Sequence, residues 1–287
     1  MNSVSAQWES LLLFGALSIA VLAIAKKKCF FSLQRQKRRW IVPLPWHQLL
    51  APFALYFAIA FFFVPLLLRG LHLLLPVTLP LIAFSTWANF LSSVAVLLSL
   101  FWYLHFKLPF LAPLLWRREK PGRWISDAQM VLWCWLFSFP LILFANHLLD
   151  LFLFYVFGII HVPEQLVVTF FKMTFGHPLY LVISMATILL LAPFIEELLF
   201  RGFLQTFFRQ HLGTSQAILL SSVCFSLFHY LPEQGLGNVS IIGSLFVLAL
   251  FLGFAYEKQG SLFTSISLHS LFNASSVVNF YFFSEVH

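Results

Sequence analysis

The sequence predicts an all-α protein, a polytopic transmembrane bundle of about eight helices. Of its 287 residues, 61% are hydrophobic and only 9% are charged, a balance typical of multi-pass membrane proteins. Long apolar stretches recur along the chain, and a helix needs about 20 such residues to cross the hydrocarbon core of a bilayer. Because these stretches are continuous, they exclude the alternating pattern of an outer-membrane barrel.

Eight apolar segments along the chain have the length of a membrane-spanning helix. They cover residues 8–25, 49–68, 81–106, 126–145, 178–209, 215–231, 239–256 and 261–283. A further apolar stretch at 148–160 predicts a short or broken element. No repeat or soluble domain interrupts this series, so we predict a single integral-membrane unit whose first partner is the lipid bilayer.

The basic residues cluster in two loops, and this asymmetry predicts the orientation of the bundle. One group follows the first span and the other follows the third. The members are Lys26, Lys27, Lys28, Arg35, Lys37, Arg38, Arg39, Lys107, Arg117, Arg118, Lys120 and Arg123. Loops rich in Lys and Arg stay in the cytoplasm, so both loops should be cytoplasmic and both termini should face the other side. Basic runs beside spans are usually topology determinants, so we expect no nucleic-acid partner.

The cysteines and the loops bear on the compartment. Cys29, Cys134 and Cys224 lie in different segments without Cys-x-x-Cys spacing, which argues against a disulfide framework and a thiolate metal site. The first apolar run has no basic region ahead of it, which indicates a retained span instead of a cleaved signal peptide. Sparse charge and short loops favour a bacterial protein, so we predict the inner (plasma) membrane.

Two adjacent glutamates, Glu196 and Glu197, lie inside an apolar stretch of the fifth span. Moving one acid to the bilayer centre costs roughly 2.5–3.5 kcal/mol on insertion scales, so a functional role is the default interpretation. Arg201 lies four residues after Glu197 on the same helix face and should pair with it. Glu196 points elsewhere and is left free to accept a proton, as a general base must.

Two later spans carry histidines in apolar surroundings. His229 ends the sequence Phe-Ser-Leu-Phe-His in the sixth span, and His269 precedes Asn273 by four residues in the eighth. Measured from the cytoplasmic ends at 1.5 Å per residue, these side chains and Glu196 lie roughly 12–21 Å deep and can meet within the membrane. Two acids, two histidines and an amide in one hydrated pocket predict a hydrolytic site.

The chemistry of these groups leaves two arrangements open. In the first, Glu196 accepts a proton from an attacking water that His229 orients, while Asn273 and His269 donate to the developing oxyanion. In the second, Glu196, His229 and His269 hold one divalent metal such as zinc, with an open fourth position. No His-Glu-x-x-His helix is present, which weakens the metal interpretation. No other cofactor is predicted.

At these residues the chain resembles the CPBP family, which comprises CAAX proteases and bacteriocin-processing enzymes and is also called the Abi family of intramembrane proteases. That family is marked by Glu-Glu-x-x-x-Arg, Phe-x-x-x-His and His-x-x-x-Asn on successive transmembrane helices. These motifs stand here as Glu196-Glu197-Leu198-Leu199-Phe200-Arg201, Phe225-Ser226-Leu227-Phe228-His229 and His269-Ser270-Leu271-Phe272-Asn273. All three match in order and spacing, and the resemblance covers about residues 178–283.

The resemblance implies an intramembrane endopeptidase acting on a membrane-associated peptide or protein. By analogy, Glu196 and His229 activate the water, His269 and Asn273 stabilise the oxyanion, and Glu197 with Arg201 supports the site.

The same resemblance suggests a division of the chain and leaves other functions open. Residues 1–145 would be amino-terminal helices with basic cytoplasmic loops, and 146–287 the protease core. A metal-dependent mechanism and a glutamate mechanism both fit. A membrane transporter, or a non-catalytic bacteriocin-immunity protein, could bury the same polar cluster.

Overall fold

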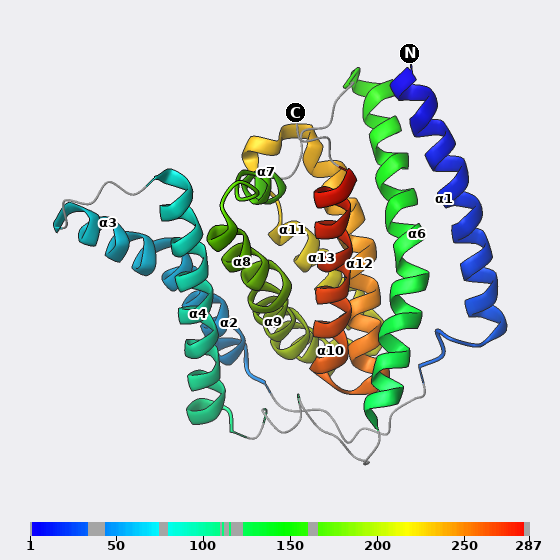
Figure 1. The fold of residues 1–287 in the computed structure, drawn as a ribbon. Helices are drawn as coiled ribbons and strands as arrows, with labels where there is room; N and C mark the ends of the chain where they lie inside the picture. Colours follow the sequence, from blue (N-terminus) through cyan, green and yellow to red (C-terminus); the bar gives the residue numbers. More distant parts are fainter. Residues whose placement is uncertain are drawn as a thin grey trace.

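The computed structural model describes residues 2–33, 44–74, 80–109, 111, 115, 123–159 and 166–283, and over these residues the regular structure is helical throughout (Figure 1). Six of the eight predicted spans lie entirely within a helix or a continuous helical series; the span at 215–231 extends three residues beyond the end of α11 at Phe228, and the span at 261–283 begins one residue before α13. This confirms the all-α membrane bundle. Six of the described helical stretches are long and apolar enough to cross a membrane by themselves.

The amino-terminal half supplies three long helical stretches. They are α1 (Asn2–Lys27), the series α2 (Trp46–Phe57), η1 (Ala58–Phe63) and α3 (Val64–Leu74), and α4 (Leu81–Lys107). Figure 1 shows α1 lying along α6 on one flank of the bundle, while α2 to α4 lie on the opposite flank. The helices that carry the predicted motifs lie between these two flanks.

The helix α6 (Arg123–Phe157) is longer than the sequence predicts. The predicted span at 126–145 and residues 148–157 of the separate stretch form a single helix of 35 residues, and residue 160 lies outside the described ranges. Asn146 and Asp150, at the junction of the two predicted segments, bond to each other and to the neighbouring helix α12. Asn146 donates to Asp150 at 2.9 Å, and Ser240 and Ser244 of the neighbouring α12 donate to this pair. Polar residues with partners on another helix do not end a helix.

The carboxyl-terminal half contains the motif helices. Its elements are α7 (Leu166–Met173), α8 (Pro178–Ala186), η2 (Thr187–Leu191), α9 (Ala192–Glu197), η3 (Leu198–Gln205), α10 (Thr206–Leu212), α11 (Thr214–Phe228), η4 (Pro232–Gly237), α12 (Asn238–Gln259) and α13 (Leu262–Phe283). From α8 to α10 the chain is one continuous helix that contains two π-helical stretches, η2 and η3. We call this continuous stretch, residues 178–212, the motif helix.

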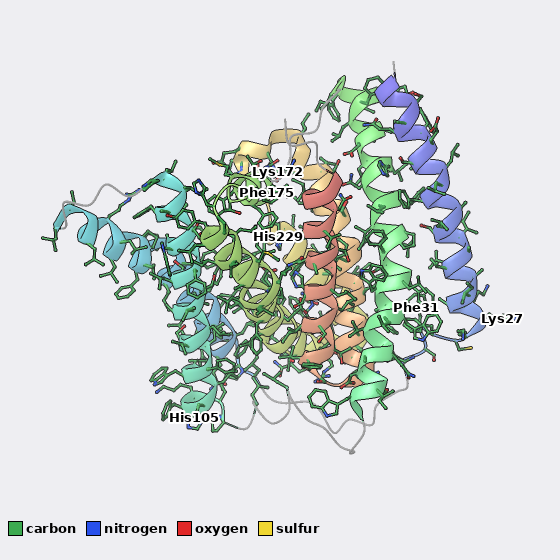
Figure 2. All side chains as sticks on the ribbon, viewed as in Figure 1. Lys27, Phe31, His105, Lys172, Phe175 and His229 are labelled. Atoms are coloured by element: carbon green, nitrogen blue, oxygen red, sulfur yellow. The ribbon has the colours of Figure 1, made fainter. Side chains whose placement is uncertain are left out.

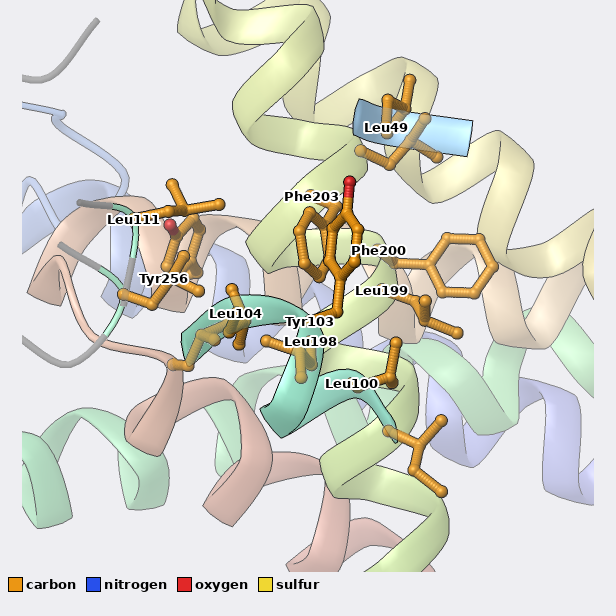
Figure 3. Close-up of a cluster of buried hydrophobic side chains, with 14 of the residues drawn as sticks. Leu49, Leu100, Tyr103, Leu104, Leu111, Leu198, Leu199, Phe200, Phe203 and Tyr256 are labelled. Atoms are coloured by element: carbon orange, nitrogen blue, oxygen red, sulfur yellow. The ribbon is translucent and has the colours of Figure 1, made fainter. Parts of the chain in front are cut away.

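A hydrophobic cluster fixes the motif helix against the amino-terminal half. Leu198, Phe200 and Phe203 are almost completely buried, and they pack against Tyr103 of α4 and Leu49 of α2 (Figure 3). Burying a large apolar side chain contributes about 1.5–3 kcal/mol, so these contacts hold the π-helical stretch η3 in place. The helices before residue 145 therefore take part in building the site.

The basic side chains mark one end of the bundle. His105 near the end of α4 lies at the lower edge of Figure 2 and Lys27 at the end of α1 lies in its lower half, whereas Lys172 of α7 lies in its upper half. Lys107 and Lys258 also lie in the last turns of helices that finish at the lower edge. We call this the basic end. Most residues of the two predicted cytoplasmic loops lie outside the described ranges.

Candidate active site

Pro193 and a π-helical turn free a backbone carbonyl beside the acid pair. The N–H of Ala192 donates to the carbonyl of Thr187, five residues earlier, and so is not available to Ile188. The next residue, Pro193, has no N–H to give. The amide of Asn273 on α13 supplies the missing donor, because its Nδ2 lies 2.9 Å from the Ile188 oxygen. This bond ties α13 to the motif helix two turns before the acid pair, and π-helical turns are frequent at functional sites.

Glu197 is the centre of a buried charged cluster. Its Oε1 lies 3.0 Å from Arg201 Nη1, as the i,i+4 spacing predicts, and both side chains have zero exposure. The same oxygen accepts a bond from His269 Nδ1 at 3.0 Å. Arg201 also donates to the carbonyl of Ala249 on α12, and its guanidinium lies 4.5 Å from the centre of the Phe225 ring. Oε1 of Glu197 therefore accepts hydrogen bonds from both Arg201 and His269.

Glu196 faces the two histidines without bonding to either. Its Oε2 lies 3.7 Å from Nε2 of His229 and 3.9 Å from Nε2 of His269. Both distances exceed those of a hydrogen bond. This oxygen is buried and has no hydrogen-bond partner among the described residues, although 19% of the Glu196 side chain is exposed. A buried acceptor without a donor is energetically costly, so we expect a hydrogen-bond donor in the space between Glu196 and the two histidines.

The Nδ1 bonds of the histidines determine which atoms face that space. Nδ1 of His229 lies 2.9 Å from the carbonyl of Phe225, and Nδ1 of His269 faces the Glu197 carboxylate. Both partners only accept, so in a neutral ring the proton is on Nδ1 and Nε2 is an acceptor. Three acceptor atoms, one oxygen and two nitrogens, therefore surround one position. A water molecule, with two O–H donors, fits such a position.

Below the acid pair, toward the basic end, a polar ladder joins the motif helix to α12. Gln205 donates to the carbonyl of Gly253 at 3.2 Å and to Glu257 at 2.9 Å, and it accepts from Ser221 of α11. One turn further along, Arg209 forms an ion pair with Glu257 at 3.0 Å, and we call these contacts of Gln205 and Arg209 the polar ladder. Sequence reasoning did not identify these residues. The available signal was the four-residue spacing of Arg201, Gln205 and Arg209 on one helix face.

Gly253 of α12 lies directly against the Gln205 side chain. A Cβ at this position would lie 2.7 Å from Gln205 Oε1 and 3.2 Å from Ile218 Cγ2. We expect Gly253→Ala to displace the Gln205 amide and to lower the free energy of unfolding by about 1–3 kcal/mol, measured by equilibrium unfolding in mixed micelles. Gly70→Ala is the control, because a Cβ there meets nothing within 4 Å. Equal stability of the two variants would contradict a tight ladder.

The amino-terminal half also forms part of the site wall. The Tyr56 and Phe57 rings of α2 lie 5.4 and 5.8 Å from that of Phe228, the neighbour of His229. Phe53, on the same helix, lies 5.6 Å from Phe200 within the first motif. No sequence feature of α2 predicted this contact, which arises from tertiary packing alone.

The metal interpretation was tested against the same geometry. Zinc binds histidine nitrogens at about 2.0–2.1 Å and usually takes three or four protein ligands. Within the described ranges, no group of three or more His, Cys, Asp or Glu side chains has the arrangement that would hold a metal ion. As placed, Glu196, His229 and His269 do not fit a metal site.

Five of the six predicted site residues form one connected cluster. Glu196, Glu197, Arg201, His229 and His269 lie within the distances given above. The sixth, Asn273, follows His269 by one turn and uses one amide hydrogen on the Ile188 carbonyl. Its second amide hydrogen remains for another acceptor. Three separate helices contribute these residues.

Comparison with known proteins agrees with this site. Residues 178–275 match the family model described as type II CAAX prenyl endopeptidase Rce1-like, and this range contains all six residues of the site. Searches of curated proteins and of solved structures gave no match to the chain. The protein is an integral membrane protein. Over the part that carries the motifs, residues 178–275, the chain is similar to the CPBP family of CAAX-type proteases.

Proposed function

We propose that the protein is an intramembrane endopeptidase in which Glu196 and His229 activate a water molecule that attacks a peptide bond. The observation that supports it most directly is the buried Oε2 of Glu196, which faces two histidine nitrogens and lacks a donor among the described residues. A water bound there would donate one hydrogen to the carboxylate and the other to His229. Its lone pair would then be directed away from the three acceptors and toward a substrate.

The proposed reaction follows from these positions. The water oxygen bonds to the carbonyl carbon of the substrate as Glu196 takes its proton, which leaves a tetrahedral oxyanion. The protonated Glu196 then gives this proton to the departing amide nitrogen as the carbon–nitrogen bond breaks. One water is consumed, and the products are a carboxylic acid and an amine. Glu196 serves as base and then as acid, so no other proton source is required.

The oxyanion would be stabilised by Asn273 and His269. The second amide hydrogen of Asn273 is free to donate. His269 would donate to the oxyanion from Nε2 as an imidazolium, with a second proton taken up from water before the reaction and kept throughout, and its Nδ1 bonds to the Glu197 carboxylate. That carboxylate, which also bonds to Arg201, would stabilise the positive ring as negative charge develops on the substrate.

A variant of His229 and a control variant of His105 test whether His229 takes part in activating the water. We expect His229→Ala to reduce cleavage by about 10²–10⁴-fold, the usual contribution of a positioned acid–base group. His105→Ala is the control, because His105 is exposed at the basic end and far from the motifs (Figure 2). Rates would be measured by mass spectrometry of the cut peptide. A His229→Ala enzyme as fast as His105→Ala would show that His229 does not act on the water.

Chelation and elemental analysis test whether the enzyme needs a bound metal ion. We expect purified enzyme to keep its activity after exhaustive chelation, because the residues at the site as placed do not fit a metal ion. Elemental analysis of the same active preparation shows whether any metal copurifies at one equivalent. Loss of activity on chelation, restored by zinc, would instead support the arrangement in which Glu196, His229 and His269 are ligands.

The substrate that we propose is a membrane-associated peptide or protein, and the location is the bacterial inner membrane. The name of the matching family implies a prenylated substrate, whereas sparse charge and short loops favour a bacterial peptide without a prenyl group. A farnesylated CAAX peptide and its unmodified counterpart separate these cases. Comparing the membrane peptides of cells with and without the gene would identify the natural substrate.

A further inference from the structure

The turn that follows His229 is held by one buried side chain, that of Asn238. Helix α11 cannot continue far past His229, because Pro232 disfavours the helical conformation at Leu231, which is extended (φ −127°, ψ 121°). The N–H and the carbonyl of Leu231 therefore leave the helical pattern and need partners elsewhere. Asn238, 4% exposed, supplies both: its Oδ1 accepts from the Leu231 N–H at 3.0 Å, and its Nδ2 donates to the Leu231 carbonyl at 2.7 Å.

The loop that this side chain closes is short and fully bonded. The same Nδ2 donates to the carbonyl of Gly235 at 3.0 Å. Gly235 adopts φ 50° and ψ −129°, a conformation that a residue with a Cβ rarely takes, and this lets the chain turn back toward Leu231. Both amide hydrogens and the amide oxygen of Asn238 are therefore used. We call these three bonds the Asn238 clamp.

The Asn238 clamp is attached to two long helices. Asn238 is the first residue of α12, and Ser240, in the same turn, donates to Asp150 of α6 at 2.5 Å. The two helices also pack closely, since a Cβ at Gly243 would clash with the side chain of Leu149. The turn after His229 is thus held against α12 and α6, and α11 alone does not determine its position.

His229 lies where α11 meets this turn. Its backbone caps the helix with φ −90° and ψ 7°, and its N–H bonds to the Ser226 carbonyl at 3.2 Å. Its ring depends on the same helix end, because Nδ1 bonds to the Phe225 carbonyl in the last turn, where backbone donors run out. The residue at which α11 ends therefore determines where Nε2 of His229 lies, and that atom is 3.7 Å from Oε2 of Glu196.

We propose that Asn238 is a positioning residue, which clamps the turn after His229, fixes where α11 ends and so keeps Nε2 of His229 facing Glu196. The inference rests on the proposed endopeptidase function for its effect on the rate, whereas its effect on the His229 ring does not depend on catalysis. Without the clamp, the Leu231 N–H would lose its partner, and α11 would be free to end at another residue. A displacement of about 1 Å at a reacting group costs about 10²-fold in rate.

Asn238→Leu tests the proposal, because leucine has nearly the same size but can form none of the three bonds. We expect kcat to fall by about 10–10²-fold and KM to change by less than about twofold, since Asn238 positions the group that activates water and does not bind substrate. Asn146→Leu is the matched control. It removes a half-buried amide of α6 that also bonds α12, through Ser244, but does not touch the turn after His229. We expect wild-type kcat per folded molecule from it.

A second comparison shows whether Asn238 acts through His229. In a His229→Ala background, Asn238→Leu should lower cleavage by less than about twofold, because the group that it positions is gone. An equal loss in both backgrounds would overturn the proposal, as would wild-type kcat in Asn238→Leu alone. If Asn238→Leu does not fold, Asn238→Asp takes its place, because aspartate keeps the acceptor for the Leu231 N–H and loses both amide hydrogens.

The ring of His229 can also be observed without catalysis. In protein labelled with ¹⁵N at histidine, the ring signals report which nitrogen carries the proton, and those of His229 are absent from His229→Gln. At a pH where the ring is neutral, we expect the proton on Nδ1 in the wild type and a mixture of tautomers in Asn238→Leu. Wild-type signals in Asn238→Leu would overturn the positioning role. Changed signals in a protein that cuts no peptide would support that role and refute the protease instead.

Discussion

Replacing Glu196 by Gln should reduce peptide cleavage by at least about 10²–10⁴-fold while leaving the protein folded. Glutamine keeps the size of the side chain but cannot accept a proton from water. Stability should change little, because Oε2 of Glu196 bonds to no described residue of the protein. Cleavage of a peptide that the wild type cuts, followed by mass spectrometry, measures the first effect. Thermal unfolding in detergent measures the second.

The control for this variant is Glu233→Gln. Glu233 lies in η4, close in the chain to His229 but exposed, so the same chemical change occurs outside the site. We expect wild-type rates from it. If Glu196→Gln cleaved as fast as Glu233→Gln, another group would have to act as the base. A transporter or an immunity protein would show no cleavage in any variant.

Replacing Arg201 by Ala should lower the free energy of unfolding by about 3–5 kcal/mol, because it leaves Glu197 as an unpaired charge in a fully buried site. The substitution also removes the bond to the Ala249 carbonyl and the contact with Phe225. Cleavage should fall with the folded fraction and with the loss of order at His269. Equilibrium unfolding in mixed micelles measures the stability of each variant.

Two further variants separate the charge from the packing. Arg69→Ala removes an exposed arginine of α3 and should leave stability unchanged. The double variant Glu197→Gln with Arg201→Met removes both charges and should recover much of the stability lost in Arg201→Ala, since neutral replacements of buried pairs are often tolerated. It should not recover cleavage, because His269 would lose its carboxylate. An Arg201→Ala protein as stable as Arg69→Ala would contradict this account.

The helices of the fold were predictable wherever the apolar length of a single segment was enough to identify a membrane span. A helix that crosses a bilayer needs a minimum apolar length, and that length is visible in the sequence. The exception was α6, where the sequence predicted two segments although Asn146 and Asp150, at their junction, bond to Ser244 and Ser240 of α12. Those partners lie about a hundred residues away. Whether a polar residue in an apolar run ends a helix depends on such partners.

In the candidate site too, contacts within one helix were predictable from the sequence and contacts between helices were not. The pairing of Arg201 with Glu197 followed from helical spacing, which requires no knowledge of the fold. The bond from His269 to Glu197 joins two helices and was not predicted, and it gives His269 a closer relation to Glu197 than its predicted oxyanion role suggested. The contact of Tyr56 with Phe228 was equally invisible, because it depends on where α2 packs.

The π-helical stretch η2 constrains how the motif helix can change in length. A π-helical turn accommodates one residue more than an α-helical turn, so the two halves of this helix keep separate angular registers. The earlier half packs against α4, and the later half directs Glu196 toward the histidines. Deleting a single residue between 187 and 191 would return this turn to α-helical geometry and leave the two halves facing their present partners, whereas a deletion outside the π-helical stretches would turn one half relative to the other by about 100°. Within this helix, η2 is therefore the place where the chain could lose one residue without moving Glu196 away from the histidines.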